Sequence, residues 1–290
     1  MQIFRLMPAP PVKTILSLQS EVVFGHVGNS AARFALQRMG HDVLGLPTVL
    51  FSNHPGHGGF RGRATPVEEL RALLDGLEER GLLAQVDAVL SGYLGEAAQA
   101  DLVREAVLRV KRLRPAAPYL LDPVFGDEGG AYARPGVAEA MAKHLLPLAD
   151  IVTPNRFELA SLTSRRIEGP ADAVSAARML GRPLVLVTSV PAGDAIATMA
   201  VTPAAAWSVA TPRVPDPPNG IGDLLAALFL GHRLGGQNVP QALGRSASAL
   251  DRLIAASRGA KDVRLVANQD MLADGQSLPA RPFPDGPSAD

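Results

Sequence analysis

The stretch NGIGDLLAALFLGHRLGG, residues 219–236, joins a glycine-rich turn to an apolar helix that two further glycines close. Glycines let the backbone approach a ligand closely and turn several N–H groups in the same direction. The N-terminus of the helix adds partial positive charge, so this turn predicts an anion site that needs no Lys or Arg. Asp223 lies in the first helical turn, where a carboxylate either caps the helix or accepts a proton from a hydroxyl that attacks phosphorus.

Strand-like segments alternate with helical segments through most of the chain, which predicts an α/β fold with a mostly parallel sheet. Several strand segments are nearly continuous apolar runs, as expected for strands covered on both faces. Strands are predicted at residues 13–18, 43–51, 86–91, 119–122, 151–153 and 184–188, with an antiparallel hairpin at 196–201 and 206–210. Helices are predicted at residues 29–39 (with Asn29 as N-cap), 96–113, 171–180 and 224–234.

The composition excludes several functional classes. The chain has no Cys, so thiolate zinc sites, iron–sulfur clusters, disulfides and a Cys nucleophile are ruled out. Lys and Arg number 28, as do Asp and Glu, and aromatic residues make up 4%. A dedicated nucleic-acid binder needs a basic face and stacking platforms, so no nucleic-acid partner is expected.

The domain organisation is simple. We expect an N-terminal extension over residues 1–12, one domain over residues 13–275, and a poorly ordered tail rich in Pro, Ser and Asp over residues 276–290. The N-terminus shows no signal peptide, and the longest apolar stretches are too short to span a bilayer. A cytoplasmic protein without a membrane partner is therefore predicted.

Seven segments in a specific order resemble the pyridoxal kinases of the ribokinase superfamily over roughly residues 13–273. The GIGD turn at residues 220–223 corresponds to the GxGD signature of that superfamily. The other six are LQS (18–20), VVFGHVGNS (22–30), TVLFSNH (48–54), SGYLG (91–95), DPVFGD (122–127) and TPNRFEL (153–159). The resemblance implies a three-layer α/β/α fold and transfer of the γ-phosphoryl group of ATP to the 5′-hydroxyl of pyridoxal.

The resemblance also implies roles for individual residues. Asp223 becomes the catalytic base, and Gly220, Ile221 and Gly222 offer backbone N–H groups to the transferring phosphate. Substrate contacts are implied for Ser20, Thr48, His54 and Tyr93. The nucleotide side is implied to contain Asp122, Glu158, Thr188, Pro212, Arg213 and Val214, with Mg²⁺ near Asp122 and Glu158. ATP and Mg²⁺ are the implied cofactors, a monovalent cation is left open, and a homodimer is expected.

Glu158 also has a purely structural explanation, because Asn155 and Glu158 have the spacing of a helix capping box. Glu158 can cap the helix and lie near Mg²⁺ at the same time. The three histidines His26, His54 and His57 match no common metal-ligand spacing, and His54 is the one expected to contact a ligand. The Gly-rich residues 54–63 are expected to form a mobile flap over the substrate, and residues 126–130 a second lid.

The chain departs from the family pattern at several positions. Position 188 holds Thr where some relatives have Lys, and the connection from Val214 to Gly220 is short and rich in proline. Leu224 and Leu225 follow Asp223, where small hydroxyl residues are usual. Two alternatives therefore stay open: a kinase of the same superfamily that acts on hydroxymethylpyrimidine or another small molecule, and a non-catalytic binder of pyridoxal or its phosphate.

Overall fold

The computed structural model describes residues 12–284. The expected N-terminal extension therefore lies, apart from Val12, outside the described residues. Within residues 12–284, no helix is long and apolar enough to cross a membrane.

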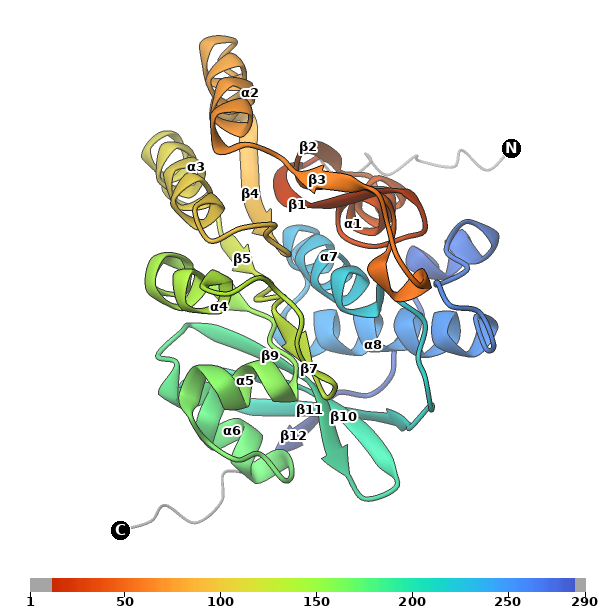
Figure 1. Cartoon of the computed structure of the whole chain (residues 1–290). Helices are drawn as coiled ribbons and strands as arrows, with labels where there is room; N and C mark the ends of the chain where they lie inside the picture. Colours follow the sequence, from red (N-terminus) through yellow and green to blue (C-terminus); the bar gives the residue numbers. More distant parts are fainter. Residues whose placement is uncertain (1–11, 285–290) are drawn as a thin grey trace, which may run out of the picture.

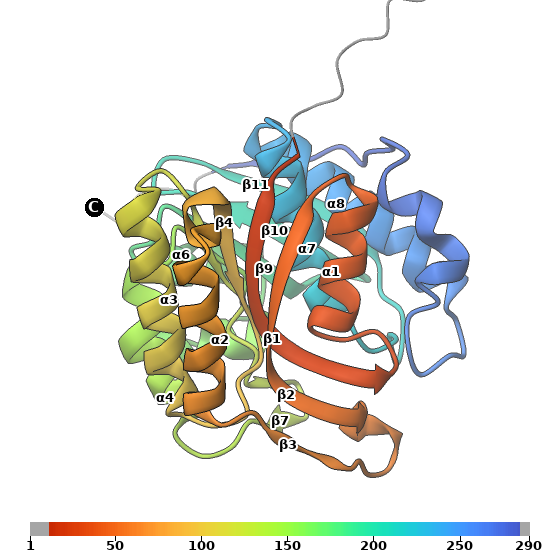
Figure 2. The same cartoon turned by 90° about the horizontal axis from the view of Figure 1, so that it is seen from above.

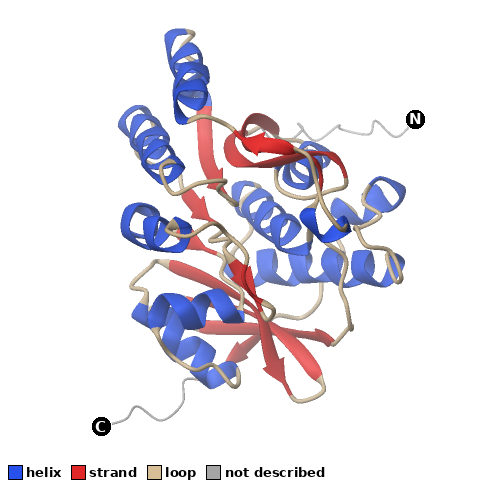
Figure 3. Cartoon of the chain, viewed as in Figure 1, coloured by secondary structure: helices blue, strands red, loops and turns tan. Residues whose placement is uncertain are grey.

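A ten-stranded mixed sheet forms the centre of the molecule, as Figures 1 and 3 show. Its order is β12-β11-β10-β9-β8-β5-β4-β1-β2-β3, and the six consecutive strands from β9 to β2 are parallel. The bounds are β1 (Thr14–Phe24), β2 (Asp42–Asn53), β3 (Gly62–Ala64), β4 (Val86–Ser91), β5 (Tyr119–Leu121), β8 (Ile151–Val152), β9 (Leu184–Ala192), β10 (Ala195–Val201), β11 (Ala206–Pro212) and β12 (Arg281–Phe283). The predicted α/β class with a mostly parallel sheet is confirmed, and so is the antiparallel hairpin β10–β11.

Helices cover both faces of the sheet, which completes the three layers (Figures 1 and 2). One face carries α1 (Asn29–Arg38), α7 (Ile221–Leu234) and α8 (Val239–Ala256). The other carries α2 (Val67–Glu79), α3 (Gln99–Leu113), α4 (Val137–Ala140), α5 (Arg156–Thr163) and α6 (Pro170–Met179). A small separate hairpin pairs β6 (Gly126–Asp127) with β7 (Gly130–Ala131).

Helix α7 is the most deeply buried of the described helices, because every residue from Leu224 to His232 is buried. The helix packs between α1 and α8, and its side chains form much of one core cluster. A helix that is apolar on all sides is stable only in such a position. Leu224 and Leu225, which depart from the family pattern, are 0% and 3% exposed, and their burial explains their identity.

Two local predictions require correction. The first concerns Asn29, which is the first residue of α1, whereas Gly28 is the N-cap without a side-chain capping bond. The Asn29 side chain instead accepts a hydrogen bond from the Ser17 hydroxyl (2.7 Å) and donates to the carbonyls of Gln19 and Leu46. The amide thereby bonds backbone carbonyls of both strands beside the point where the register between β1 and β2 shifts.

The second concerns the tail, which is ordered through Pro284, contrary to the prediction for residues 276–290. Strand β12 (Arg281–Phe283) pairs antiparallel with the edge strand β11, and the Leu278 N–H donates to the Gly244 carbonyl at 3.0 Å. Composition misled the prediction because an edge strand supplies unpaired backbone groups to any extended segment within reach, including a proline-containing one. Residues 285–290 lie outside the described residues.

Candidate active site

Several of the residues singled out by sequence lie at the ends of the parallel strands or just after them. Ser20 lies in β1, Tyr93 follows β4, Asp122 follows β5 and Thr188 lies in β9. Open α/β sheets bind ligands at the carboxyl ends of their strands, and the N-terminus of α7 opens at this edge.

The turn before α7 requires glycine at its first position. Gly220 is the N-cap with φ +92°, and a Cβ there would lie 1.9 Å from the His26 carbonyl oxygen. Gly222 is exposed, and a Cβ there would meet no other atom within 4 Å. The first N–H groups of a helix have no partner within the helix, so this turn presents donors to the site.

Asp223 does not cap α7. The N-cap is Gly220, and the helix has no side-chain capping bond. The residue keeps intermediate solvent exposure, whereas its carboxylate is surrounded by protein atoms. Burial raises the pKa of Asp223 to about 6, against the opposing effect of backbone N–H groups from Gly28 and Asp223 itself. A carboxylate with this pKa is ionised at neutral pH and is a stronger base than an exposed aspartate.

Two further carboxylates lie deep beside Asp223. Asp122 is 4% exposed and Glu158 is 3% exposed. Burial raises the pKa of Asp122 to about 8, with a further contribution from the charge of Asp223, while a 2.7 Å hydrogen bond from the Thr153 hydroxyl opposes the shift. The pKa of Glu158 is also raised, first by burial and then by Asp122. Carboxylates that repel each other in this way favour a bound cation.

The structure confirms the predicted capping box. Asn155 Oδ1 accepts from the Glu158 N–H, and Glu158 Oε2 accepts from the Asn155 N–H, both at 2.9 Å. The other oxygen, Oε1, accepts from the Phe125 N–H at 3.2 Å, and Asn155 Nδ2 donates to the Gly126 carbonyl at 2.8 Å. Glu158 therefore joins α5 to the segment that leads into the β6–β7 hairpin.

The predicted substrate residues lie around the ends of β1, β2 and β4. Ser20 is 8% exposed, at a register shift between Gln19 and Glu21, and Gly28 packs so tightly on it that a Cβ would lie 2.2 Å from its hydroxyl oxygen. Tyr93 is partly exposed beside an apolar cluster, and burial raises the pKa of its phenol.

Thr48 is fully buried, and its hydroxyl donates to the Tyr93 carbonyl at 2.6 Å. Gln99, which the sequence analysis did not select, joins the same region. It accepts from the Gly95 N–H and donates to the carbonyls of Thr48 and Thr65, each at 2.8 Å. A buried amide that satisfies three backbone groups has no sequence signature apart from its position at the start of a helix.

The glycine-rich segment at residues 54–63 begins with a single 3-10 turn, Pro55–His57, and ends in β3, which pairs with β2. His54 Nδ1 accepts from the Gly56 N–H at 3.2 Å, and the His57 ring contacts Asp262. Ser52, Asn53, Gly59, Phe60 and Arg61 line a hollow of about 430 Å³ in this segment. In the second lid, the Arg156 guanidinium pairs with the Glu128 carboxylate.

On the nucleotide side, Thr188 forms a bridge with Asn155, and its N–H donates to the Pro154 carbonyl at 3.0 Å. Pro212 is the last residue of β11, followed by exposed Arg213 and by Val214. Because β9, β10 and β11 are successively antiparallel, β11 runs in the direction of β9 and ends at the same edge. The structure thus brings Thr188 beside the acidic residues and places residues 212–214 further along the sheet.

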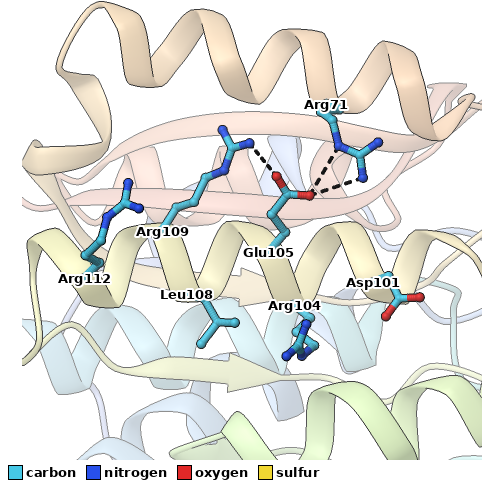
Figure 4. A pocket seen from close by; sticks show the side chains of 7 residues that line it. All are labelled: Arg71, Asp101, Arg104, Glu105, Leu108, Arg109 and Arg112. Carbon is cyan, nitrogen blue, oxygen red and sulfur yellow. Dashed lines mark hydrogen bonds and ion pairs between the residues drawn. The ribbon is translucent and has the colours of Figure 1, made fainter.

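A larger hollow, of about 620 Å³, lies elsewhere, between α2 and α3 (Figure 4). Its lining residues are Arg71, Asp101, Arg104, Glu105, Leu108, Arg109 and Arg112. Arg71 pairs with Glu105, Arg109 with Asp75, Glu78 and Glu105, and Arg112 with Glu78. The hollow is therefore lined largely by residues in neutralised ion pairs, and none of its lining residues is among the site residues predicted from the sequence.

Known proteins resemble this chain over most of its length. The model of the phosphomethylpyrimidine kinase family matches residues 76–265. A pyridoxal kinase PdxY from Deinococcus radiodurans is 45% identical over 89% of this chain and 92% of its own, and one from Rubrobacter xylanophilus is 44% identical over 89% and 93%. The structure of a pyridoxal kinase from Leishmania donovani with ADP and ginkgotoxin matches with a TM-score of 0.89 and 29% identity, over 94% of this chain and all of that one. This extent of similarity, together with the turn before α7, shows that the chain belongs to the PdxY pyridoxal kinases of the ribokinase superfamily.

Proposed function

We propose that this protein uses ATP to phosphorylate the 5′-hydroxyl of pyridoxal, giving pyridoxal 5′-phosphate. The observation that carries the proposal is the turn at residues 220–223, where free helix N–H groups and a buried carboxylate with a pKa of about 6 share one helix N-terminus. The relatives named pyridoxal kinase support the substrate class, as do the Leishmania structures with ADP and with pyridoxine.

In the proposed reaction, Asp223 accepts the proton of the substrate hydroxyl as its oxygen attacks the γ-phosphorus of ATP. The N–H groups at Gly220, Ile221 and Gly222 bind the negative charge that develops on the transferring phosphoryl group. Gly220 sets the direction of these groups, because only its φ of +92° lets the chain pass the His26 carbonyl. These parts position the reactants and stabilise charge, which is the main requirement of phosphoryl transfer.

The residues at Asp122 suit Mg²⁺. One oxygen, Oδ2, is buried and has no hydrogen-bond partner among the described residues. Hard cations prefer oxygen ligands, and Mg²⁺ usually keeps several waters and the nucleotide phosphates as its other ligands. Asp122 would hold the ion. Glu158 would contribute negative charge without direct contact, because both Glu158 oxygens already accept hydrogen bonds from backbone N–H groups.

For the substrate, we propose that Ser20 binds the pyridine ring by its hydroxyl, that Tyr93 packs against the ring, and that His54 covers it. Thr48 acts indirectly by holding the Tyr93 carbonyl. Thr188 and residues 212–214 are proposed to contact the nucleotide. The β6–β7 hairpin and residues 54–63 are proposed to exclude water during transfer.

The family model alone favours a pyrimidine as the alternative substrate, because the family is described as phosphomethylpyrimidine kinase. Its match begins at residue 76, however, and so leaves out the segments that contain Ser20, Thr48 and His54. The pyridoxal kinase relatives cover 89% of the chain. The non-catalytic alternative depends on Leu224 and Leu225 and on the short connection from Val214 to Gly220. Burial in the core accounts for the two leucines.

A homodimer is proposed from the sheet edge. Strands β1, β2 and β3 extend past the helices (Figure 2), and Val23, Phe24 and Leu50 there are 91%, 63% and 43% exposed. A second copy of this chain is the proposed partner, because two copies of zero net charge meet without net repulsion and cover the same apolar residues.

Replacement of Asp223 by Asn is expected to lower kcat for pyridoxal phosphorylation by roughly 10²–10⁴-fold, because general-base assistance is lost. The KM for ATP should change little, since the N–H groups of the turn remain. Formation of pyridoxal phosphate from ATP, Mg²⁺ and pyridoxal measures the effect, with Asp270→Asn, whose side chain is 95% exposed, as the control. Retention of most of the activity would exclude Asp223 as the base, and turnover of hydroxymethylpyrimidine but not pyridoxal would refute the proposed substrate.

The pH profile should report the same carboxylate. Because the pKa of Asp223 is about 6, kcat/KM should be level above that pH and fall about tenfold per pH unit below it. The acidic limb should occur at the same pH with pyridoxine as acceptor, because it belongs to the free enzyme. A profile that stays flat from about pH 5 to 8 would contradict the assignment.

Asp122→Asn should stabilise the protein in nucleotide-free, Mg²⁺-free buffer above pH 8. The folded pKa of Asp122 is raised from 3.8 to about 8, so stability from the protonated group is lost as pH rises through that interval. Thermal midpoints should coincide near pH 4 and diverge by several degrees near pH 8, with the variant higher. The same variant should lose activity. The substitution removes a charge that destabilises the fold, but that charge belongs to the proposed ligand of Mg²⁺. Equal midpoints at pH 8 would show that the Asp122 charge is not destabilising.

Size-exclusion chromatography with light scattering tests the dimer. The protein should elute at about twice its chain mass of 30.4 kDa, and Val23→Glu should shift it to the monomer. Leu108→Glu on α3, an exposed apolar residue away from this edge, is the matched control and should stay dimeric. A wild-type monomer, or a dimer insensitive to Val23→Glu, would refute the proposed interface.

A further inference from the structure

One carboxylate connects two parts of the site that are far apart in sequence. Asp262 Oδ1 accepts a hydrogen bond from Asn219 Nδ2 at 3.1 Å, and His57 Nε2 lies 3.0 Å from the same oxygen. An ionised carboxylate only accepts, so Nε2 of His57 must carry the proton of that bond. The side chains of His57 and Asp262 are 16% and 13% exposed, which shields the pair from solvent.

The backbone attaches Asp262 to the anion turn. The Asn219 N–H donates to the Lys261 carbonyl at 2.8 Å, and the Val263 N–H donates to the Asn219 carbonyl at 3.4 Å. Val263 is 2% exposed and belongs to the α7–α8 core, so this side of the contact is rigid. Gly220 follows directly, and its Cα packs against the His26 carbonyl.

On the other side, His57 ends the single turn Pro55–His57 at the start of the flap, residues 54–63. Its ring meets Phe24 edge-on, with centroids 5.5 Å apart. The flap also bonds to its own strands, as from Asn53 Nδ2 to the Gly59 carbonyl (2.7 Å) and from the Arg61 N–H to Ser52 Oγ (2.9 Å), and its last part reaches α2 through Arg63 and Glu69 (3.1 Å). The bond from His57 is therefore what ties this turn to the C-terminal part of the chain.

We infer that Asp262 is a positioning residue that couples the seating of the flap, through His57, to the shape of the anion turn, through Asn219. The inference rests on the proposed kinase function. With the flap seated, two donors hold the carboxylate, and Asn219 keeps the following N–H groups directed at the phosphate. When the flap lifts, the carboxylate keeps one donor, and the turn loses part of its restraint. The turn is thus shaped for transfer when the flap excludes water, which disfavours ATP hydrolysis without an acceptor.

Kinetics with matched variants test the coupling. His57→Ala and Asp262→Ala should each lower kcat about tenfold, with a larger fraction of ATP hydrolysed without transfer, because small displacements of a positioning group are costly. Asp262→Asn keeps an acceptor oxygen and should retain more activity than Asp262→Ala. Within an Asp262→Ala background, adding His57→Ala should change kcat less than about twofold, since both remove one linkage. The control is Asp270→Ala, an aspartate of the same C-terminal region that is 95% exposed, and it should match wild type.

Hydrogen–deuterium exchange on the ligand-free protein provides a readout independent of activity. His57→Ala should increase exchange at residues 214–223 as well as at 54–63, although position 57 lies outside the first segment. Unchanged exchange at residues 214–223, or fully multiplicative effects of His57→Ala and Asp262→Ala on kcat, would overturn the coupling. If wild type fails to phosphorylate pyridoxal, the proposed function is wrong, and the exchange result still decides whether Asp262 couples the two segments. A variant that does not fold is replaced in this comparison by Asp262→Asn.

Discussion

The burial of α7 is the constraint on which the site depends. The helix is enclosed from Leu224 to His232 and packs between α1 and α8, so its axis has little freedom. Its N-terminus is the exception, because Gly220, Ile221 and Gly222 lie at the open edge of the sheet. A rigid interior helix thus presents its unpaired N–H groups at a defined place. A neutral chain can bind an anion there without a basic surface, since the donors belong to the backbone.

The acidic residues around that helix end favour a cation, whereas the helix N-terminus favours an anion. Asp122, Glu158 and Asp223 are held together by burial, by Thr153 and by backbone donors, and the pKa of each is raised. In the free protein, ionisation of these carboxyl groups is therefore unfavourable, and a bound cation would favour it. This arrangement trades stability for function, as active sites commonly do. The buried capping box at Asn155 and Glu158 shows one carboxylate serving helix stability and site electrostatics together.

The flap and the lid connect this centre to the surface. Residues 54–63 contact the C-terminal segment through His57 and Asp262, and the β6–β7 hairpin contacts α5 through Glu128 and Arg156. Both depend on polar contacts of a few exposed or partly exposed side chains, whereas the strands behind them are fully packed. Segments held in this way are the ones able to open while the core remains intact.

Sequence by itself determined the α/β class, most strand positions, the antiparallel hairpin, the glycine turn and the capping box, because each depends on residues close together in the chain. Periodicity and turn chemistry act over a few residues, and an ordered set of motifs identified the family. The tertiary structure decided what depends on distant partners. In the fold, Asn29 bonds both β1 and β2 near the shift in their register. Leu224 and Leu225 lie in the core, and β12 pairs with the edge strand β11. The tertiary structure also brought Asp262 to His57, 205 positions away, since a half-buried carboxylate takes its donors from the groups that the fold places beside it.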